Sequence, residues 1–192
     1  YLAEILDLSI DDLKYLDIEE VEQALKENPL IKNVSAFYLN SETLYVDYTL
    51  RKPVFALADL ENTALDLDGH LFPLNPYFTP KKLPELCLGL KEVISFNKPL
   101  KGEEIALAAQ LYHLLKRDVK RIDLSQIAKS SLGKREIVVI LELPNEVKHT
   151  LRLSTKNYEN QLLDYQILRP AIQEKDLIID LRVPELAYIT ST

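Results

Sequence analysis

The sequence predicts an α+β protein built from two parts, and two observations lead to this prediction. Short amphipathic helices and a pair of alternating strands fill residues 1–58, whereas residues 59–192 are richer in strands and contain two longer helices. The chain is also long enough for two modest cores, because 47% of its 192 residues are hydrophobic. We therefore expect a small helix-and-strand module followed by a mixed β domain with two longer helices.

The first module opens with two helix-like segments. Apolar residues follow helical spacing in "YLAEILDL" at residues 1–8. A second helix has Asp17 as its N-cap and Glu20 at the capping-box position. The Asn28-Pro29 pair ends this helix, whose buried stripe comprises Ile18, Val21 and Leu25.

Two strands complete the first module. The segment "IKNVSAFYL" at residues 31–39 predicts one strand, and a loop follows at residues 40–42. The next segment, "TLYVDYTL" from Thr43, alternates and predicts the second strand of a hairpin. One face of this strand should pack on the helix that contains Val21 and Leu25, and that face comprises Leu44, Val46, Tyr48 and Leu50.

The first part of the β domain is predicted from turn residues and one helix. In "DLDGHLFPL" the Asp68-Gly69 pair places a turn between two short strands. Prolines punctuate the connection that follows at residues 75–86. Residues 103–117 predict a helix, because acidic residues begin it and two cations end it, which complements the helix dipole.

The last part of the chain predicts a hairpin, a helix and a closing strand. Residues 135–144 and 147–154 form the two arms of the hairpin. Residues 155–169 have helical spacing, and Pro170 stops the helix. Residues 176–190 predict a strand that a proline interrupts, with no turn that would return the chain.

Composition argues against nucleic-acid binding, and the sequence contains no membrane-spanning segment. The net charge of −7 argues against nucleic-acid binding, which needs a concentrated positive surface, and the basic clusters here are short and isolated. No apolar run reaches the roughly 18 residues needed to span a bilayer. The chain begins at Tyr1 and contains no methionine, so we expect a fragment or processed product, with any membrane anchor upstream.

Residues able to carry catalysis or hold a metal are scattered. The histidines at positions 70, 113 and 149 have no metal-ligand spacing and fit surface or turn positions. Cys87 lacks a catalytic signature nearby and fits a small buried hydrophobe. No phosphate loop, dinucleotide-binding motif or serine-hydrolase elbow is present in the sequence. We therefore expect no enzyme activity, no catalytic or metal site and no cofactor.

Several short motifs occur in a fixed order along nearly the whole chain. They are "PLIKNVS" after the second helix, "TLYVDYTLRKPVFAL", "LDLDGHLFPL", "LPEL" followed by "LG", "IDLS" at residues 122–125 and "IDLR" at residues 179–182. In this order they resemble the FtsQ/DivIB family of bacterial cell-division proteins. No single motif is specific, and the resemblance rests on their order and spacing.

The resemblance implies a POTRA-like fold for residues 1–58, with the first strand of that fold upstream of Tyr1. It implies a non-catalytic, single-pass inner-membrane protein whose soluble part lies on the periplasmic side. Such a protein is a scaffold that links early and late division proteins. Its expected partners are FtsB-like and FtsL-like coiled-coil proteins, with other division proteins contacting the POTRA-like domain.

The same resemblance assigns Arg51, Lys52 and Pro53 to the domain junction, where they end the last POTRA strand. Proline cannot donate to a ladder, so pairing stops there. The alternative reading of the two cations is a simple charged strand end.

The resemblance also indicates that an FtsB-like partner is held at the end of the chain. A terminal strand at a sheet edge leaves backbone groups unpaired, which invites a partner strand. We expect that strand beside residues 178–190, with Tyr188 as an aromatic anchor and Arg182 paired with a partner carboxylate. The alternative is that Tyr188 packs internally and Arg182 pairs within the domain. The candidate partner-binding residues are Ile178, Ile179, Asp180, Arg182, Leu186, Tyr188 and Ile189.

Two other functions stay open at this stage. One is a POTRA-bearing component of outer-membrane assembly or secretion, although such proteins usually carry tandem repeats and no second repeat is visible in the sequence. The other is a periplasmic enzyme that acts on the cell wall, but the sequence contains no set of catalytic residues that supports it.

Overall fold

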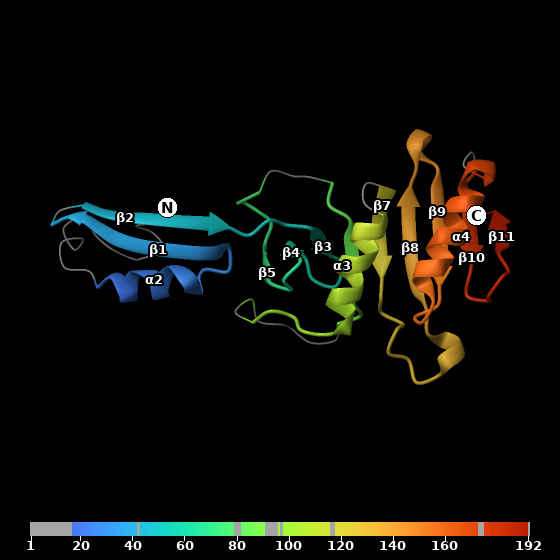
Figure 1. The fold of residues 1–192 in the computed structure, drawn as a ribbon, viewed down its shortest axis with the longest axis horizontal. Helices are drawn as coiled ribbons and strands as arrows, with labels where there is room; N and C mark the ends of the chain where they lie inside the picture. The colour runs from blue at the N-terminus through green and yellow to red at the C-terminus, as the bar shows by residue number, and fades with distance from the viewer. Residues whose placement is uncertain are drawn as a thin grey trace.

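The computed structural model describes residues 17–41, 43–78, 82–90, 96, 98–115, 118–172 and 175–191. Within these ranges the fold is α+β, as predicted, with three α-helices, a two-stranded sheet and a nine-stranded mixed sheet (Figure 1). None of these helices is long and apolar enough to cross a bilayer. The helix expected at residues 1–8 and the POTRA strand expected upstream of Tyr1 lie outside the described residues.

The first module is a helix packed on a two-stranded hairpin. Helix α2 (Ile18–Glu27) begins as predicted, because the Asp17 carboxylate accepts a hydrogen bond of 2.9 Å from the backbone N–H of Glu19. Strands β1 (Ile31–Asn40) and β2 (Thr43–Leu50) pair antiparallel beside the helix (Figure 1). The core between helix and hairpin contains Val21, Leu25, Ile31 and Ala36, with Ile18, Val34, Leu44 and Val46 packed against them.

Only part of the expected face of β2 lies in this core. Leu44 and Val46 pack against the buried residues, as predicted. Tyr48 and Leu50, further along the same strand, are 37% and 44% exposed. The pairing register shifts between Ile31 and Asn33, opposite this end of β2, and such an irregularity redirects neighbouring side chains. The core of the first module is therefore smaller than the sequence pattern indicates.

The chain passes from one sheet to the other at residues 51–54. Strand β2 ends at Leu50, and β3 (Phe55–Leu57) already pairs within the large sheet. The large sheet therefore begins before the boundary predicted at residue 58. Pro53 lies between the two strands, and its missing N–H is a physical reason for the break in pairing.

The large sheet has the strand order β11-β10-β9-β8-β7-β6-β3-β4-β5. The pairs β3–β6, β6–β7 and β9–β10 are parallel, and the other neighbours are antiparallel. The predicted hairpin is confirmed as β8 and β9, and the predicted turn before β5 is confirmed with Gly69 at φ 86°. The bounds of the remaining strands are β4 (Thr63–Leu65), β5 (Leu71–Pro73), β6 (Glu85–Cys87), β7 (Val119–Asp123), β8 (Ile137–Glu142), β9 (Lys148–Leu153), β10 (Leu177–Asp180) and β11 (Tyr188–Ser191).

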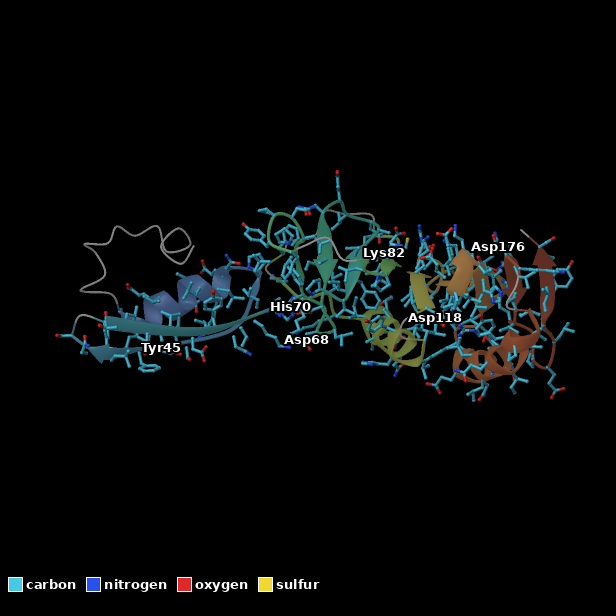
Figure 2. The ribbon with its side chains drawn as sticks, turned by 90° about the horizontal axis from the view of Figure 1, so that it is seen from above. Tyr45, Asp68, His70, Lys82, Asp118 and Asp176 are labelled. Atoms are coloured by element: carbon cyan, nitrogen blue, oxygen red, sulfur yellow. The ribbon has the colours of Figure 1, made fainter. Side chains whose placement is uncertain are left out.

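Helices α3 (Glu103–Leu115) and α4 (Tyr158–Ile172) cover the same face of the large sheet (Figures 1 and 2). Helix α3 lies between β6 and β7 in the chain, and α4 lies between β9 and β10, so each helix connects two parallel strands. Side chains of both helices, among them Leu111 and Tyr165, pack with strand residues such as Leu151 in the main core. Residues of this core come from position 54 onward, and they include Phe55 and Leu57, which precede the predicted boundary at residue 58.

Helix α4 differs from the prediction at both ends. It starts at Tyr158, because residues 155–157 form a turn in which the N–H of Asn157 donates to the Ser154 hydroxyl at 3.1 Å. The prediction that Pro170 stops the helix is wrong, since Pro170 lies inside its last turn. A proline so close to the C-terminal end removes one hydrogen bond, and the helix ends soon after it rather than before it.

The end of the chain is not one interrupted strand. β10 and β11 are separate strands that pair antiparallel, with Asp180 opposite Tyr188. The chain reverses between them in a turn where Glu185 adopts a left-handed backbone conformation with φ 60°. The prediction that no turn returns the chain is therefore wrong. A glutamate occupies the position where glycine or asparagine would have signalled the turn.

Candidate partner-binding edge

Strand β11 lies at one end of the large sheet and has a paired neighbour on one side only. No described strand pairs with its outer side, so the N–H and C=O groups there are open to another strand. The opposite edge of the sheet is protected. There, β5 ends in Pro73, which has no N–H to donate, and Phe72 packs with Leu30 of the first module. The two ends of the sheet are therefore not equivalent.

The β11 edge lies at the far end of the molecule from the first module (Figure 1). Exposed apolar side chains lie beside this edge. Val183, Leu186 and Tyr188 are 58%, 60% and 68% exposed. All three line one surface hollow, so they lie close together. Grouped exposed apolar side chains of this kind are typical of protein–protein contact surfaces.

Two hollows flank the connection from β10 to β11. One has a volume of about 510 Å³ and lies between this connection and helix α4, where Ile167 and Leu168 line it. The other has a volume of about 420 Å³, and Arg135 is among the residues that line it. Val183 and Leu186 line both hollows, so the connection forms a ridge between them. The second hollow also borders β11, because Tyr188 lines it.

Apart from Arg182, the predicted partner-binding residues fall into two groups. Ile178, Ile179 and Asp180 lie in β10, which pairs with β9 on one side and with β11 on the other. Their backbone groups are used within the sheet, so the expectation of one free edge over residues 178–190 is wrong. The second group lies on the free edge or directly before it and comprises Leu186, Tyr188 and Ile189.

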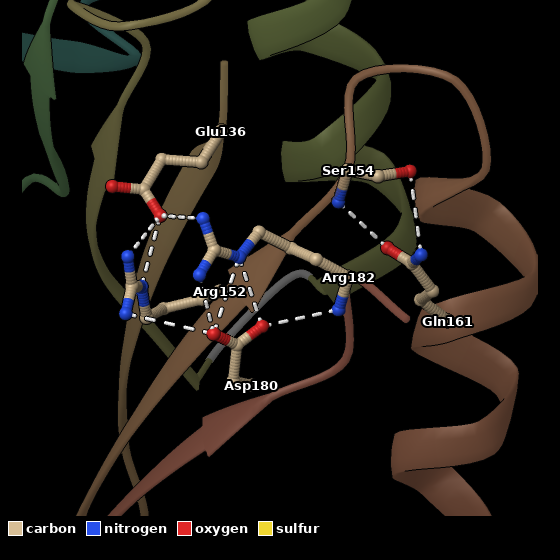
Figure 3. A network of polar contacts seen from close by, with 6 residues as sticks. All are labelled: Glu136, Arg152, Ser154, Gln161, Asp180 and Arg182. Carbon is tan, nitrogen blue, oxygen red and sulfur yellow. Dashed lines mark hydrogen bonds and ion pairs between the residues drawn. The ribbon is translucent and has the colours of Figure 1, made fainter. Parts of the chain in front are cut away.

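Arg182 pairs within the domain (Figure 3). Its Nη2 and Nε atoms lie 2.6 and 2.9 Å from the two carboxylate oxygens of Asp180. Its Nη1 atom lies 3.2 Å from Glu136 Oε2, and Glu136 also accepts from Nε and Nη2 of Arg152 at 2.8 and 2.7 Å. For Arg182 the structure therefore bears out the alternative of internal pairing. Tyr188, in contrast, does not pack internally, because it is 68% exposed.

Asp180 and Arg182 stabilise each other's charged forms. Hydrogen bonds from the Arg182 guanidinium hold the pKa of Asp180 below its ordinary value, against the opposing effect of burial. The hydrogen bond to Asp180 likewise raises the pKa of Arg182. Both side chains thus stay ionised at neutral pH, and their contact persists there.

The expectation that the histidines occupy surface or turn positions is wrong for His149, which lies buried within β9 beneath α4. His149 is fully buried, and its Nδ1 and Nε2 atoms lie 2.8 Å from the Tyr165 hydroxyl and 3.1 Å from the Lys175 carbonyl oxygen. Burial lowers the pKa of His149 and raises that of Tyr165 to about 12. The signal in the sequence was alternation, which places His149 on the same strand face as Leu151 and Leu153. The pair joins α4 to β9 and has a structural role.

The predicted junction residues differ in their contacts. Arg51 Nη1 donates to Asp66 Oδ2 at 3.0 Å, and the two side chains are only 12% and 7% exposed. The other Asp66 oxygen accepts the backbone N–H groups of Asp68 and His70, which lie where the two modules meet (Figure 2). Lys52 is exposed. Arg51 is therefore a structural residue that ties the first module to a turn of the second.

In the described ranges, the residue types that often serve catalysis either lie far from one another or already make structural hydrogen bonds. There, no group of three or more His, Cys, Asp and Glu side chains is placed to hold a metal ion. Cys87 Sγ lies 4.0 Å from Asp59 Oδ1, and burial raises the pKa of the thiol, whereas a nucleophilic cysteine needs a lowered pKa. The Asp59 carboxylate accepts the backbone N–H groups of Leu88 and Leu90, which is a structural use.

Comparison with known proteins gives no assignment. The chain matches no family model, and the search of curated proteins found no match. The functional argument therefore rests on the site itself.

Proposed function

We propose that this chain is the periplasmic part of a single-pass inner-membrane scaffold of the bacterial division machinery, of the FtsQ/DivIB kind. In this proposal it catalyses no reaction and needs no cofactor. It links early and late division proteins through protein–protein contacts, and FtsB-like and FtsL-like coiled-coil proteins are its partners. The observation that carries the proposal is the unpaired outer edge of β11 beside the exposed side chain of Tyr188.

The chemistry of this edge suits strand addition. An extended partner segment would satisfy the outward N–H and C=O groups of β11 and extend the large sheet by a strand. Backbone pairing supplies affinity, and side chains that enter the hollows on both sides of the connection supply selectivity. Tyr188 is suited to be the anchor, because aromatic residues are enriched among those that dominate binding energy.

The order of the modules supports the same proposal. A helix-and-hairpin module precedes a mixed sheet, as the resemblance to FtsQ/DivIB proteins implies. The "RKP" segment falls at the change of sheets, and the Asp68-Gly69 turn lies where the first module meets the second. A fold hosts many functions, so partner binding is the decisive measurement.

Proline substitutions at two adjacent positions of β11 test the proposal. Successive residues of a strand direct their N–H groups to opposite sides. One of Ile189→Pro and Thr190→Pro therefore removes a hydrogen bond to β10, and the other removes an outward N–H. Thermal melting and hydrogen exchange identify the variant that keeps the β10–β11 ladder. Binding is then titrated with a labelled peptide from the FtsB-like protein of the same organism.

The variant that keeps the ladder but lacks the outward N–H should bind this peptide about tenfold less tightly than the parent, or more weakly still. Leu163→Ala is the control, since Leu163 is an exposed residue of α4 outside both hollows. It should bind like the parent. Equal binding by the parent and the outward proline variant would show that no strand adds at β11.

A further inference from the structure

Four charged side chains in or next to strands β8, β9 and β10 form a closed ring at one end of the large sheet (Figure 3). Glu136 accepts from the guanidinium groups of both Arg152 and Arg182. Asp180 contacts the same two guanidinium groups, and the longest of these contacts is 3.5 Å. Acids and bases alternate, so each charge has two neighbours of opposite sign. We call this set the charge ring, and it comprises Glu136, Arg152, Asp180 and Arg182.

The charge ring lies where the chain leaves β10 on its way to β11. Glu136 directly precedes β8, Arg152 lies near the end of β9, and Asp180 is the last residue of β10. Arg182 belongs to the connection, and its backbone N–H also donates to Asp180 Oδ1 at 3.1 Å. The ring therefore holds the first residues of the connection against strands β8 and β9.

Among the described residues, the connection has few other anchors to the sheet. Leu181 is buried, and its N–H donates to the carbonyl oxygen of Arg152 at 2.9 Å. The N–H of Leu186 donates to the carbonyl oxygen of Val183 at 3.3 Å, which closes a turn within the connection itself. The side chains from Val183 to Leu186 are exposed, and contact with the main core resumes only at Ala187. The direction of the connection thus depends on how Arg182 is held at its start.

We propose that Glu136 is a positioning residue for the partner-binding edge, an inference that rests on the proposed function. Glu136 lines neither hollow and is separated from β11 by β9 and β10, so it does not touch a strand added there. It acts through Arg182, whose guanidinium it holds beside Asp180. Without the charge of Glu136, two guanidinium groups share the single carboxylate of Asp180 and repel each other. The start of the connection then loosens, and Tyr188 with it.

Glu136→Gln tests this role because it removes the charge and keeps the size of the side chain. The matched control is Glu142→Gln, since Glu142 is the last residue of β8, at the opposite end of that strand from Glu136, and pairs with Lys120 at 3.3 Å. Hydrogen exchange is measured on the free proteins, and binding is measured with the FtsB-like peptide described above. Glu136→Gln should speed exchange of the amides in residues 183–191 and weaken peptide binding about three- to tenfold. Exchange within β8 and β9 should stay at the parent rate, and Glu142→Gln should change neither quantity.

Parent-like exchange at residues 183–191 in Glu136→Gln would overturn the inference. Faster exchange spread equally over β8, β9 and β11 would also overturn it, because that pattern indicates general destabilisation. If exchange is faster only at residues 183–191 but the peptide binds as tightly as to the parent, the position of the edge does not affect partner affinity. That result would also overturn the inference. If the parent itself does not bind the peptide, the proposed function fails, and the exchange data alone decide whether Glu136 positions β11.

Discussion

Tyr188 lies directly opposite Asp180 in the β10–β11 pair, and the Asp180 carboxylate holds Arg182 through contacts of 2.6 and 2.9 Å. One exposed aromatic side chain and one internally paired arginine are therefore linked through a single residue of β10. This relationship separates two roles that the sequence pattern suggests together. Tyr188 faces outward, where a partner can meet it, and Arg182 fixes the start of the connection from within the domain.

Replacing Tyr188 with alanine should weaken peptide binding and leave folding unchanged. At 68% exposure its side chain has little packing to lose, so the free energy of unfolding should change by less than about 0.5 kcal/mol. Removal of an aromatic anchor costs about 2 kcal/mol of binding free energy, which is roughly a thirtyfold rise in Kd. Tyr45→Ala is the control, because Tyr45 is 45% exposed on the hairpin at the opposite end of the molecule (Figure 2). Equal Kd values for the parent and Tyr188→Ala would place the anchor elsewhere.

Local patterns predicted the parts of the fold that form between neighbours in the sequence. Alternation predicted the β8–β9 hairpin, and Asp68-Gly69 predicted the turn before β5, because each feature depends on a few adjacent residues. Strands β3 and β6 could not be predicted from the sequence, because three residues are too few to show alternation. They pair with each other across a long stretch of chain, and no local signal marks that pairing.

Partner binding near the end of the chain stays a prediction, and the sequence did not show how the residues there are arranged. Residues 176–190 resemble one strand because Glu185 gives no turn signal, although its backbone makes the reversal. Glu136, Arg152 and Arg182 come from separate segments and meet only in the folded sheet. An arginine near the end of a chain fits a partner contact as well as an internal one until its neighbours are known.

Asp66→Asn should destabilise the junction far more than Asp68→Asn. Loss of the Asp66 charge leaves Arg51, which is only 12% exposed, without its counter-ion, and such a change costs about 3 kcal/mol. Asp68 also forms an ion pair between the modules, with Lys32 at 2.6 Å, but both side chains are about half exposed, at 51% and 48%. Solvent screens this second pair, so its loss should cost less than about 1 kcal/mol. Urea unfolding of both variants measures the difference, and equal losses of stability would refute the structural role of the Arg51–Asp66 pair.

Val46→Asp should unfold the first module. Val46 packs against the core that contains Val21 and Leu25, where a carboxylate has no partner, and the expected cost is about 2–4 kcal/mol. Thr49→Asp is the matched control, because Thr49 is exposed on the other face of the same strand, and it should stay within about 0.5 kcal/mol of the parent. Urea unfolding followed by circular dichroism measures the stability of both variants. A parent-like midpoint for Val46→Asp would mean that the buried face of β2 is wrongly assigned.

His149 should make the protein less stable as the pH falls below about 6.5, its ordinary pKa. A carbonyl oxygen only accepts, so Nε2 carries the hydrogen that is donated to Lys175, and Nδ1 accepts from the Tyr165 hydroxyl. The neutral ring therefore satisfies both partners. Burial is the largest cause of its lowered pKa. The charge of Arg169 acts in the same direction, whereas hydrogen bonds to the backbone and the charge of Asp176 oppose it.

The sign of this pH dependence follows from proton binding. In the unfolded chain the His149 ring takes up a proton near pH 6.5, whereas in the folded protein it does so only at a lower pH. Between these values the unfolded state binds more protons, so the free energy of unfolding falls as the pH is lowered. Urea unfolding from about pH 7.5 to about pH 5 measures this slope, because Asp180 loses its charge only at still lower pH. His149→Gln should flatten the slope, and His113→Gln, at an exposed position of α3, should keep it. Identical slopes for the parent and His149→Gln would show that another group governs stability in this range.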